Sequence, residues 1–110
     1  MDQEEYVEVV LSLVEHVPAG RVTTYGAIAA AVGRGGPRQV GRVMATHGGL
    51  VPWWRVVRAD GSLPSCHGGE ARARHLEEGT ALRPSGGVDM RAAMWWPSPE
   101  MSARSDVIEE

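Results

Sequence analysis

Apolar residues recur at helical spacing near the start of the chain. They fall three or four positions apart along residues 3–16, which is the spacing of an amphipathic helix. Glutamates occupy the early turns, where the helix dipole favours negative charge. The pattern predicts a helix over residues 3–16, ended by Pro18 and Gly20. The apolar positions are Val7, Val10, Leu11, Val14 and Val17.

Two shorter helical segments follow, and glycines separate them. The first is rich in alanine; Thr23 or Thr24 can serve as its N-cap, and Gly33 as its C-terminal stop. The second begins at Pro37, a residue type that suits the first position of a helix, and runs to about Thr46. Two short helices joined by a tight glycine turn, the second carrying arginines near its start, predict a helix-turn-helix.

Shorter elements are predicted beyond these helices. Residues 55–58 have the composition of a strand, and Asp60-Gly61 signals a turn. Residues 69–78 predict a short charged helix. Residues 80–83 are compatible with an edge strand, and residues 89–95 with one or two helical turns. Because a strand and a turn after a helix-turn-helix are the layout of a winged helix, we expect a mainly α fold, a winged-helix-like DNA-binding domain with a small β wing.

A chain of 110 residues is short enough for one domain. We expect residues 1–97 to form it, and residues 98–110, dominated by Pro, Ser and Glu, to be a disordered tail. The single cysteine, Cys66, excludes an internal disulfide and fits a reducing compartment. The acidic N-terminus does not resemble a signal peptide, and no apolar run is long enough to cross a membrane. These features predict a cytoplasmic protein with no membrane partner.

Charge is distributed unevenly, although the net charge is only −3. Residues 16–59 contain six arginines and no Asp or Glu, whereas the other 66 residues hold all 14 acidic residues and five arginines. A local charge of +6 therefore stands beside −9 elsewhere. Near its end the basic segment carries two adjacent tryptophans, Trp53 and Trp54. A cationic surface with large aromatic rings suits phosphates and unstacked bases, so the pattern predicts nucleic-acid binding.

Several blocks of residues occur in the order found in a known family. They are Pro18-Ala-Gly-Arg-Val-Thr-Thr-Tyr-Gly-Ala-Ile-Ala, Arg38-Gln-Val-Gly, Pro52-Trp-Trp-Arg-Val-Val, Gly68-Gly69 and Glu78-Gly79. Over residues 3–79 the chain therefore resembles the DNA-binding domain of O6-alkylguanine-DNA alkyltransferases. The active-site motif of that family reads Pro-Cys-His-Arg-Val, with the cysteine as alkyl acceptor. Here Trp53 stands at the cysteine position and Trp54 at the histidine position, so the chain resembles the alkyltransferase-like proteins, in which tryptophan replaces that cysteine.

The replacement has a chemical consequence. Dealkylation requires a thiolate that attacks the alkyl carbon, and a base that lowers the pKa of the thiol. An indole offers no comparable nucleophile. Glu78, which matches a buried glutamate of the family, would have no histidine to orient. We therefore expect a site that binds its ligand without reacting, so the protein would not be an enzyme.

The resemblance also implies roles for individual residues. It places Tyr25 beside the DNA backbone, where it helps to rotate the target phosphate, and makes Arg38 the finger that fills the gap left by an extruded nucleotide. Without it, Tyr25 and the tryptophans fit ordinary packing, and Arg38 fits a solvated helix start. The candidate DNA-binding residues are Thr24, Tyr25, Arg38, Gln39, Gly41 and Arg42. The candidate residues of an alkylguanine pocket are Tyr25, Trp53, Trp54, Arg55, Val56, Val57, Cys66 and His67.

Cys66 and His67 admit other interpretations. A thiol beside an imidazole could be a displaced nucleophile or half of a zinc site. Zinc needs four ligands in a closed geometry, and the chain has no second pair of this kind. A loop thiol without catalytic duty, at the rim of the pocket, is the simpler interpretation. No metal and no cofactor is therefore expected.

The sequence thus predicts a monomer that binds double-stranded DNA carrying O6-alkylguanine. It would approach through the minor groove, flip the damaged base into a pocket around Trp53 and hold it without removing the alkyl group. By resemblance, such a complex marks the lesion for nucleotide excision repair, so proteins of that pathway are implied partners. Two alternatives remain open: a winged-helix transcriptional regulator that reads a DNA sequence, and an alkyltransferase that uses Cys66.

Overall fold

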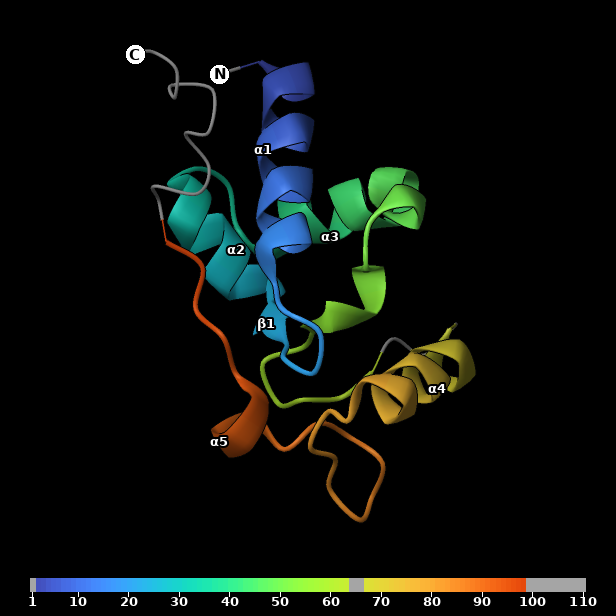
Figure 1. Ribbon diagram of the computed structural model, residues 1–110. Helices are drawn as coiled ribbons and strands as arrows, with labels where there is room; N and C mark the ends of the chain where they lie inside the picture. The colour runs from blue at the N-terminus through green and yellow to red at the C-terminus, as the bar shows by residue number, and fades with distance from the viewer. Residues whose placement is uncertain (1, 64–66, 99–110) are drawn as a thin grey trace, which may run out of the picture.

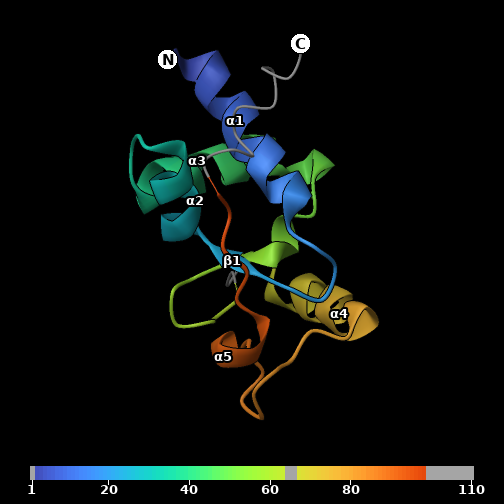
Figure 2. The ribbon, with the colours of Figure 1, turned by 60° about the vertical axis from the view of Figure 1, so that its left-hand side comes forward.

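The computed structural model describes residues 2–63 and 67–98. Helices α1, α2 and α3 lie together on one side of β1, and α4 and α5 lie on the other side, as both views show (Figures 1 and 2). In chain order the elements within the described ranges are α1 (Gln3–His16), β1 (Thr23–Thr24), α2 (Tyr25–Val32), α3 (Pro37–His47), the 3-10 turns η1 (Gly48–Leu50) and η2 (Trp53–Arg55), β2 (Val56–Val57), α4 (Gly68–Glu78) and α5 (Met90–Ala93).

Local capping sets the ends of the helices. Asp2 starts α1, because its side chain accepts a hydrogen bond from the N–H of Glu5 at 2.8 Å. Thr24 caps α2, and its Oγ1 accepts from the N–H of Ala27 at 3.0 Å. Gly33 follows α2 with a φ of 82°, a left-handed conformation that favours glycine. These ends of α2 are the ones that the sequence predicts.

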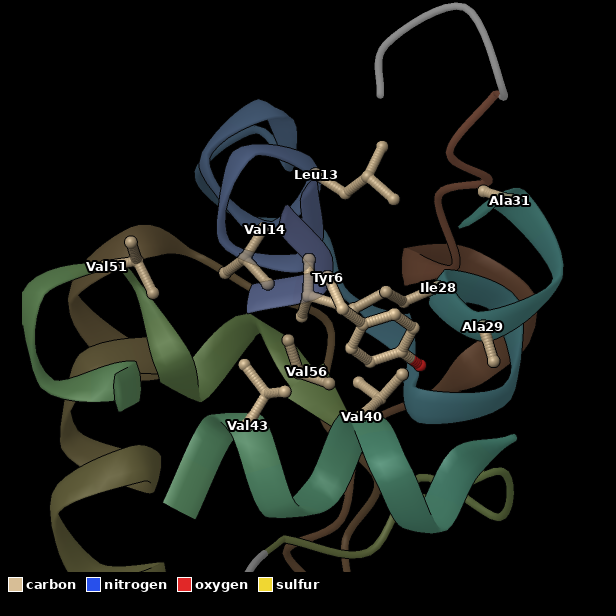
Figure 3. Packing of buried hydrophobic residues seen from close by; sticks show 11 residues of the cluster. Tyr6, Leu13, Val14, Ile28, Ala29, Ala31, Val40, Val43, Val51 and Val56 are labelled. Carbon is tan, nitrogen blue, oxygen red and sulfur yellow. The ribbon is translucent and has the colours of Figure 1, made fainter. Parts of the chain in front are cut away.

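Helices α1, α2 and α3 enclose the larger hydrophobic core (Figure 3). Side chains from the chain beyond α3 complete it, so the core joins the helix-turn-helix of α2 and α3 to the following segment. Burial of this apolar surface is the main driving force for folding. The buried residues of the core are Tyr6, Val10, Leu13, Val14, Ile28, Ala29, Ala31, Val40, Val43, Val51 and Val56.

A small parallel sheet lies between helices α1, α2 and α3 on one side and helices α4 and α5 on the other. Strands β1 and β2 pair in parallel, which places the start of α2 beside the chain that leaves η2. Val22 forms a parallel bridge with Met94, so the segment after α5 reaches the same place. Arg21 donates from its guanidinium to the carbonyl oxygens of Ala93 and Met94. A second core lies here, formed by Val22, Val57, Val88 and Ala93.

The fold class predicted from the sequence is confirmed: the molecule is mainly helical, with a helix-turn-helix and a small β element. The strand is shorter than predicted, since only Val56 and Val57 are extended and the residues before them form η2. Its partner among the described residues is β1. The predicted turn is present, with the N–H of Gly61 donating to the carbonyl of Arg58 at 2.8 Å.

The C-terminal part of the described chain is largely irregular. Leu82 forms one antiparallel bridge with Val88, and α5 occupies a single helical turn within the predicted residues 89–95. The predicted tail, residues 98–110, lies outside the described residues except for Ser98. No helix in the described ranges is long and apolar enough to span a bilayer.

Candidate functional site

A pocket of about 360 Å³ opens where α2, α3, η2 and α4 meet. Ligand pockets commonly measure about 300–1,000 Å³, so this one suits a small ring system rather than a large ligand. Its wall combines aromatic side chains with several small residues. The lining residues are Tyr25, Gly41, Met44, Ala45, Gly48, Gly49, Trp53, His67 and Glu70.

One face of α3 forms a wall of the pocket. The lining positions Gly41, Met44 and Ala45 of α3 and Gly48 directly after it recur at spacings of three and four residues, so they form one row. Met44 is the only long side chain in that row. A Cβ added to Gly48 would stand 3.2 Å from Cε of Met44 and 3.6 Å from Cβ of Trp53. The absence of a side chain at Gly48 therefore keeps space open between Met44 and Trp53.

Trp53 is half-buried and contributes its indole ring to the pocket. The centroid of this ring lies 5.7 Å from that of Trp54, with the planes at 85°. The ring of His67 lies 5.7 Å from Trp53 on centroids, at an angle of 60°. Edge-to-face contacts of this kind are favourable and restrict ring orientation. Two neighbouring rings thus hold Trp53 in place at the pocket.

Trp54 is not among the lining residues and supports Trp53 from outside the pocket. Its Nε1–H donates to Oε2 of Glu78 at 3.0 Å, and its carbonyl oxygen lies 2.8 Å from Nε2 of His75. The guanidinium carbon of Arg74 lies 4.7 Å from the centroid of the Trp54 ring, within cation–π distance. Trp54 therefore connects the pocket wall to α4.

The carboxylate of Glu78 accepts hydrogen bonds from three residues. Besides Trp54, it accepts from Arg55, whose Nε lies 3.1 Å from Oε1 and whose Nη2 lies 2.6 Å from Oε2. The N–H of Gly20 donates to Oε1 at 3.2 Å. Burial alone would raise the pKa of Glu78, but the hydrogen bonds from these donors outweigh it and hold the pKa below its ordinary value of 4.5. Glu78 is therefore ionised at neutral pH.

A buried histidine completes this network. His75 is fully buried, and its Nδ1 lies 2.9 Å from Oγ1 of Thr80. Because Nε2 faces the carbonyl oxygen of Trp54, Nε2 carries the proton of the neutral ring and Nδ1 accepts from the Thr80 hydroxyl. Burial lowers the pKa of His75 below its ordinary value of 6.5. The ring is therefore neutral at pH 7.

The cationic face is smaller than the charge pattern predicts. Arg21 and Arg55 are half-buried and donate to backbone carbonyls, and Arg55 also pairs with Glu78. Their charges are therefore used inside the protein. Arg38 precedes Gly41 by three residues, so it extends the pocket row of α3 by one turn. The exposed arginines of residues 16–59 are Arg34, Arg38, Arg42 and Arg58.

The structure brings part of the predicted pocket together. The predicted pocket residues that line it are Tyr25, Trp53 and His67. Trp54 and Arg55 stand behind it, bound to α4. Val56 and Val57 are fully buried in the two hydrophobic cores, so their side chains do not reach the pocket. Cys66 lies outside the described residues.

The predicted DNA-contact residues lie at the start of α2 and along α3. Arg38, Gln39 and Arg42 are exposed. Oε1 of Gln39 accepts from the N–H of Gly36 at 2.9 Å, so this side chain also caps α3. The hydroxyl of Thr24 is used as the cap of α2. These two polar residues therefore have local structural partners.

Sequence reasoning missed five lining residues: Met44, Ala45, Gly48, Gly49 and Glu70. A signal existed on α3, since positions three, four and seven after Gly41 share its helix face. No local signal existed for Glu70, because only the packing of α4 against η2 brings it to the pocket.

The side chains of the pocket can bind a ligand by stacking and by hydrogen bonding. Tyr25 and Trp53 offer aromatic rings, and His67 and Glu70 offer polar groups. Such a combination binds flat heterocycles. Within residues 2–63 and 67–98, no group of three His, Cys, Asp or Glu side chains is arranged to hold a metal ion.

Comparison with known proteins places this geometry in context. The sequence model described as 6-O-methylguanine DNA methyltransferase, DNA binding domain, matches residues 5–80. A DNA base-flipping protein of Escherichia coli (strain K12) is 33% identical over 98 residues, covering 84% of this chain and 76% of that protein. A DNA base-flipping protein of Vibrio parahaemolyticus is 29% identical over 100 residues, covering 86% of this chain and 99% of that protein.

Solved structures match as well. The crystal structure of S. pombe Atl1 in complex with damaged DNA containing O6-carboxymethylguanine superposes with a TM-score of 0.77 and 32% identity. A second structure, S. pombe ATL in complex with DNA, gives a TM-score of 0.75 and 30% identity. Each match covers 88% of this chain and 100% of the other.

Proposed function

Since the chain belongs to the alkyltransferase-like proteins of the 6-O-methylguanine DNA methyltransferase family, we propose that it captures O6-alkylguanine in double-stranded DNA. It flips the damaged base into the pocket beside Trp53 and holds it there with the alkyl group intact. Residues 1–97 form the binding unit. The base enters from the minor groove, with α3 as the element that contacts the duplex.

A single observation carries the proposal: an indole lines the pocket at the position where the motif of the family has its acceptor thiol. Trp53 presents a ring that can stack on a base. Alkyl transfer to Trp53 would require a nucleophilic atom in its side chain. The indole nitrogen does not act as a nucleophile near neutral pH. The pocket is therefore suited to retain the lesion and not to reverse it.

The energies involved are of matching size. Extruding a base costs a few kcal/mol of lost stacking and pairing, and less where the pair is damaged. Stacking on an aromatic side chain returns about 1–3 kcal/mol per base. Arg38 is the residue that we propose enters the gap in the duplex, and its exposure one turn along the pocket row of α3 supports this role. Pocket and finger together therefore offset more of the cost for a weakened pair than for an intact one.

The relatives support this proposal by their names and complexes. The two bacterial relatives are DNA base-flipping proteins, and the S. pombe structure contains damaged DNA with an O6-alkylated guanine. Their similarity extends over more than four fifths of this chain.

The proposal includes a downstream step. A protein that holds a lesion without reversing it leaves the alkyl group to be removed by others. Nucleotide excision repair removes a damaged strand segment whatever the alkyl group is, so its proteins are the partners that we propose. The protein would act as a monomer in the cytoplasm, where a single cysteine, Cys66, would remain reduced.

The test compares two duplexes that differ only in one guanine or O6-methylguanine, by fluorescence anisotropy at about 50 and 200 mM salt. We expect tighter binding to the methylated duplex at both concentrations. Salt should weaken both complexes by a similar factor, because phosphate contacts are common to them. The DNA recovered after incubation with excess protein should retain its methyl group.

Other outcomes identify the alternatives. Equal affinity for the two duplexes, with preference for one DNA sequence, would indicate a transcriptional regulator. Loss of the methyl group, with a matching mass increase on Cys66, would indicate an alkyltransferase. Either result contradicts capture without repair.

A further inference from the structure

We propose that the pocket discriminates by charge, disfavouring O6-substituents that carry a negative charge relative to neutral and cationic ones, and that Glu70 is the residue responsible. This inference rests on the proposed function and deepens it, because it names the class of lesion that the same site accepts. Nothing in the motifs shared with the family requires an acid at Glu70.

The formal charges at the pocket point in one direction. Among the lining residues in the described ranges, Glu70 is the only one with a carboxylate, and none is Arg or Lys. The other polar side chains of the lining are those of Tyr25 and His67. The remaining side chains are aromatic, apolar or absent. Among the residues that the structure describes, the lining therefore offers a ligand one carboxylate and no Arg or Lys.

The nearest cations do not cancel this charge. Arg74 lies one turn after Glu70 on α4, and its Nη2 is 3.8 Å from Oε2 of Glu70. Their side chains are 47% and 55% exposed, so the pair is loose and well solvated. The guanidinium of Arg74 also lies over the ring of Trp54, outside the pocket. Arg55 is bound to Glu78.

The exposed arginines of α3 are not available either. Arg38 and Arg42 are outside the lining. In the proposed complex Arg38 enters the gap in the duplex, and the phosphates of the duplex compete for Arg42. A pocket of about 360 Å³ has dimensions comparable with the screening length of about 8–10 Å at physiological salt. An anionic substituent anywhere in the pocket therefore experiences the charge of Glu70.

The natural probe is O6-carboxymethylguanine, the adduct in the DNA bound to S. pombe Atl1. Its carboxylate is ionised at neutral pH. The matched neutral adduct is O6-carbamoylmethylguanine, which has the same number of heavy atoms and an amide in place of the acid. The matched cationic adduct is O6-(2-aminoethyl)guanine. Affinity differences among the three report charge more than size.

The experiment measures the affinity of the full-length protein for duplexes carrying guanine, O6-methylguanine or one of these three adducts at a single position. We expect the carboxymethyl duplex to bind about tenfold more weakly than the carbamoylmethyl duplex, as for two like charges a few ångströms apart at a partly solvated site. The aminoethyl duplex should bind at least as tightly as the carbamoylmethyl one. Higher salt should shrink the differences.

Variants separate the source of the effect. We call the factor by which the carboxymethyl duplex binds more weakly than the carbamoylmethyl duplex the carboxymethyl deficit. Glu70→Gln should reduce this deficit to about twofold or less, since the amide keeps the shape of the side chain and removes its charge. Glu77→Gln removes the same charge two turns away on α4, outside the pocket lining, and should leave the deficit unchanged.

The outcomes distinguish this inference from the proposed function. If O6-methylguanine and guanine bind equally, the proposed function fails. If O6-methylguanine is preferred but the carboxymethyl duplex binds as tightly as the carbamoylmethyl duplex, only the charge selectivity fails. A deficit that persists undiminished in Glu70→Gln overturns the assignment to Glu70.

Discussion

At the scale of single residues, Trp54 shows what an indole does beside the pocket. By the resemblance it stands at the position of the histidine in the alkyltransferase motif, and here it donates a hydrogen bond from Nε1 to Glu78. An indole nitrogen only donates, whereas an imidazole can also accept a proton. An indole at this position therefore donates to the carboxylate but cannot serve as a base. Both changes, at Trp53 and at Trp54, lead away from thiol chemistry.

A substitution of Arg38 should affect binding to damaged DNA more than binding to intact DNA. In the variant Arg38→Ala, we expect affinity for an O6-methylguanine duplex to fall about tenfold further than affinity for the unmodified duplex, because the finger fills a gap that forms only when a base is flipped. Anisotropy titrations of both duplexes measure this difference.

The matched control is Arg42→Ala, an exposed arginine one turn further along α3. A surface arginine that contacts phosphate should weaken both duplexes alike and reduce the salt slope by about one. If Arg38→Ala also weakened both duplexes equally, Arg38 would be an ordinary phosphate contact.

At the scale of elements, the pocket depends on how α4 is attached to η2. Glu78, the last residue of α4, binds Trp54 and Arg55 in that turn and the N–H of Gly20 in the loop after α1. His75, one turn earlier, binds the carbonyl of Trp54. These contacts fix the turn that carries Trp53 at the side of the pocket. The position of Trp53 in the pocket therefore depends on the contacts between α4 and η2.

The variant Glu78→Gln tests the junction. The amide cannot neutralise Arg55, whose side chain is 16% exposed, so a charge would be left largely buried. We expect the free energy of unfolding to fall by about 1–3 kcal/mol, less than for a fully buried pair. Urea titration followed by tryptophan fluorescence measures this loss.

Glu77→Gln serves as the control, because Glu77 is an exposed neighbour on the same helix. Its effect should stay within about 0.5 kcal/mol. Equal stability of Glu78→Gln and the unaltered protein would mean that the hydrogen bonds of Glu78 contribute little and that packing alone holds α4.

At the scale of the whole molecule, two hydrophobic cores meet at the small sheet, and buried polar groups lie where they join. Thr23 in β1 is fully buried and pairs with Val56, and Val56 and Val57 belong to one core each. Glu78 and His75 form hydrogen bonds with Trp54 and Arg55 of η2, which directly precedes Val56 and Val57. Protonation there should therefore affect the stability of the whole chain rather than one loop.

We expect stability to fall as the pH is lowered from about 7 to about 5. Burial lowers the pKa of His75 below its ordinary 6.5, so the unfolded chain binds a proton more readily than the folded one. The contribution of His75 is therefore complete above about pH 6.5 and is lost as the pH falls below it. Glu78, whose pKa is also lowered, adds a further loss only below its ordinary 4.5.

Urea unfolding at about pH 7 and about pH 5 measures the change. In His75→Gln the decline should be smaller, because the amide does not titrate, while His47→Gln, at an exposed position, should show the full decline. An undiminished decline in His75→Gln would assign the pH dependence to other groups.

The sequence by itself determined the ends of α2 and the absence of a thiol at position 53. Helix ends depend on neighbours in the chain, so Thr24 and Gly33 could be recognised as the limits of α2. Trp53 could be recognised in the same way, because the residue type at a motif position is known from the sequence alone. The family and the fold class follow from information of this kind.

Only the tertiary structure decided which residues of the motif face the ligand. Val56 and Val57 turn into the cores, and Arg55 pairs with a carboxylate 23 residues away. Glu70 reaches the pocket because α4 packs against η2. The physical reason is the same in each case. The direction of a side chain and its partner depend on segments distant in sequence, which come together only when the cores are packed.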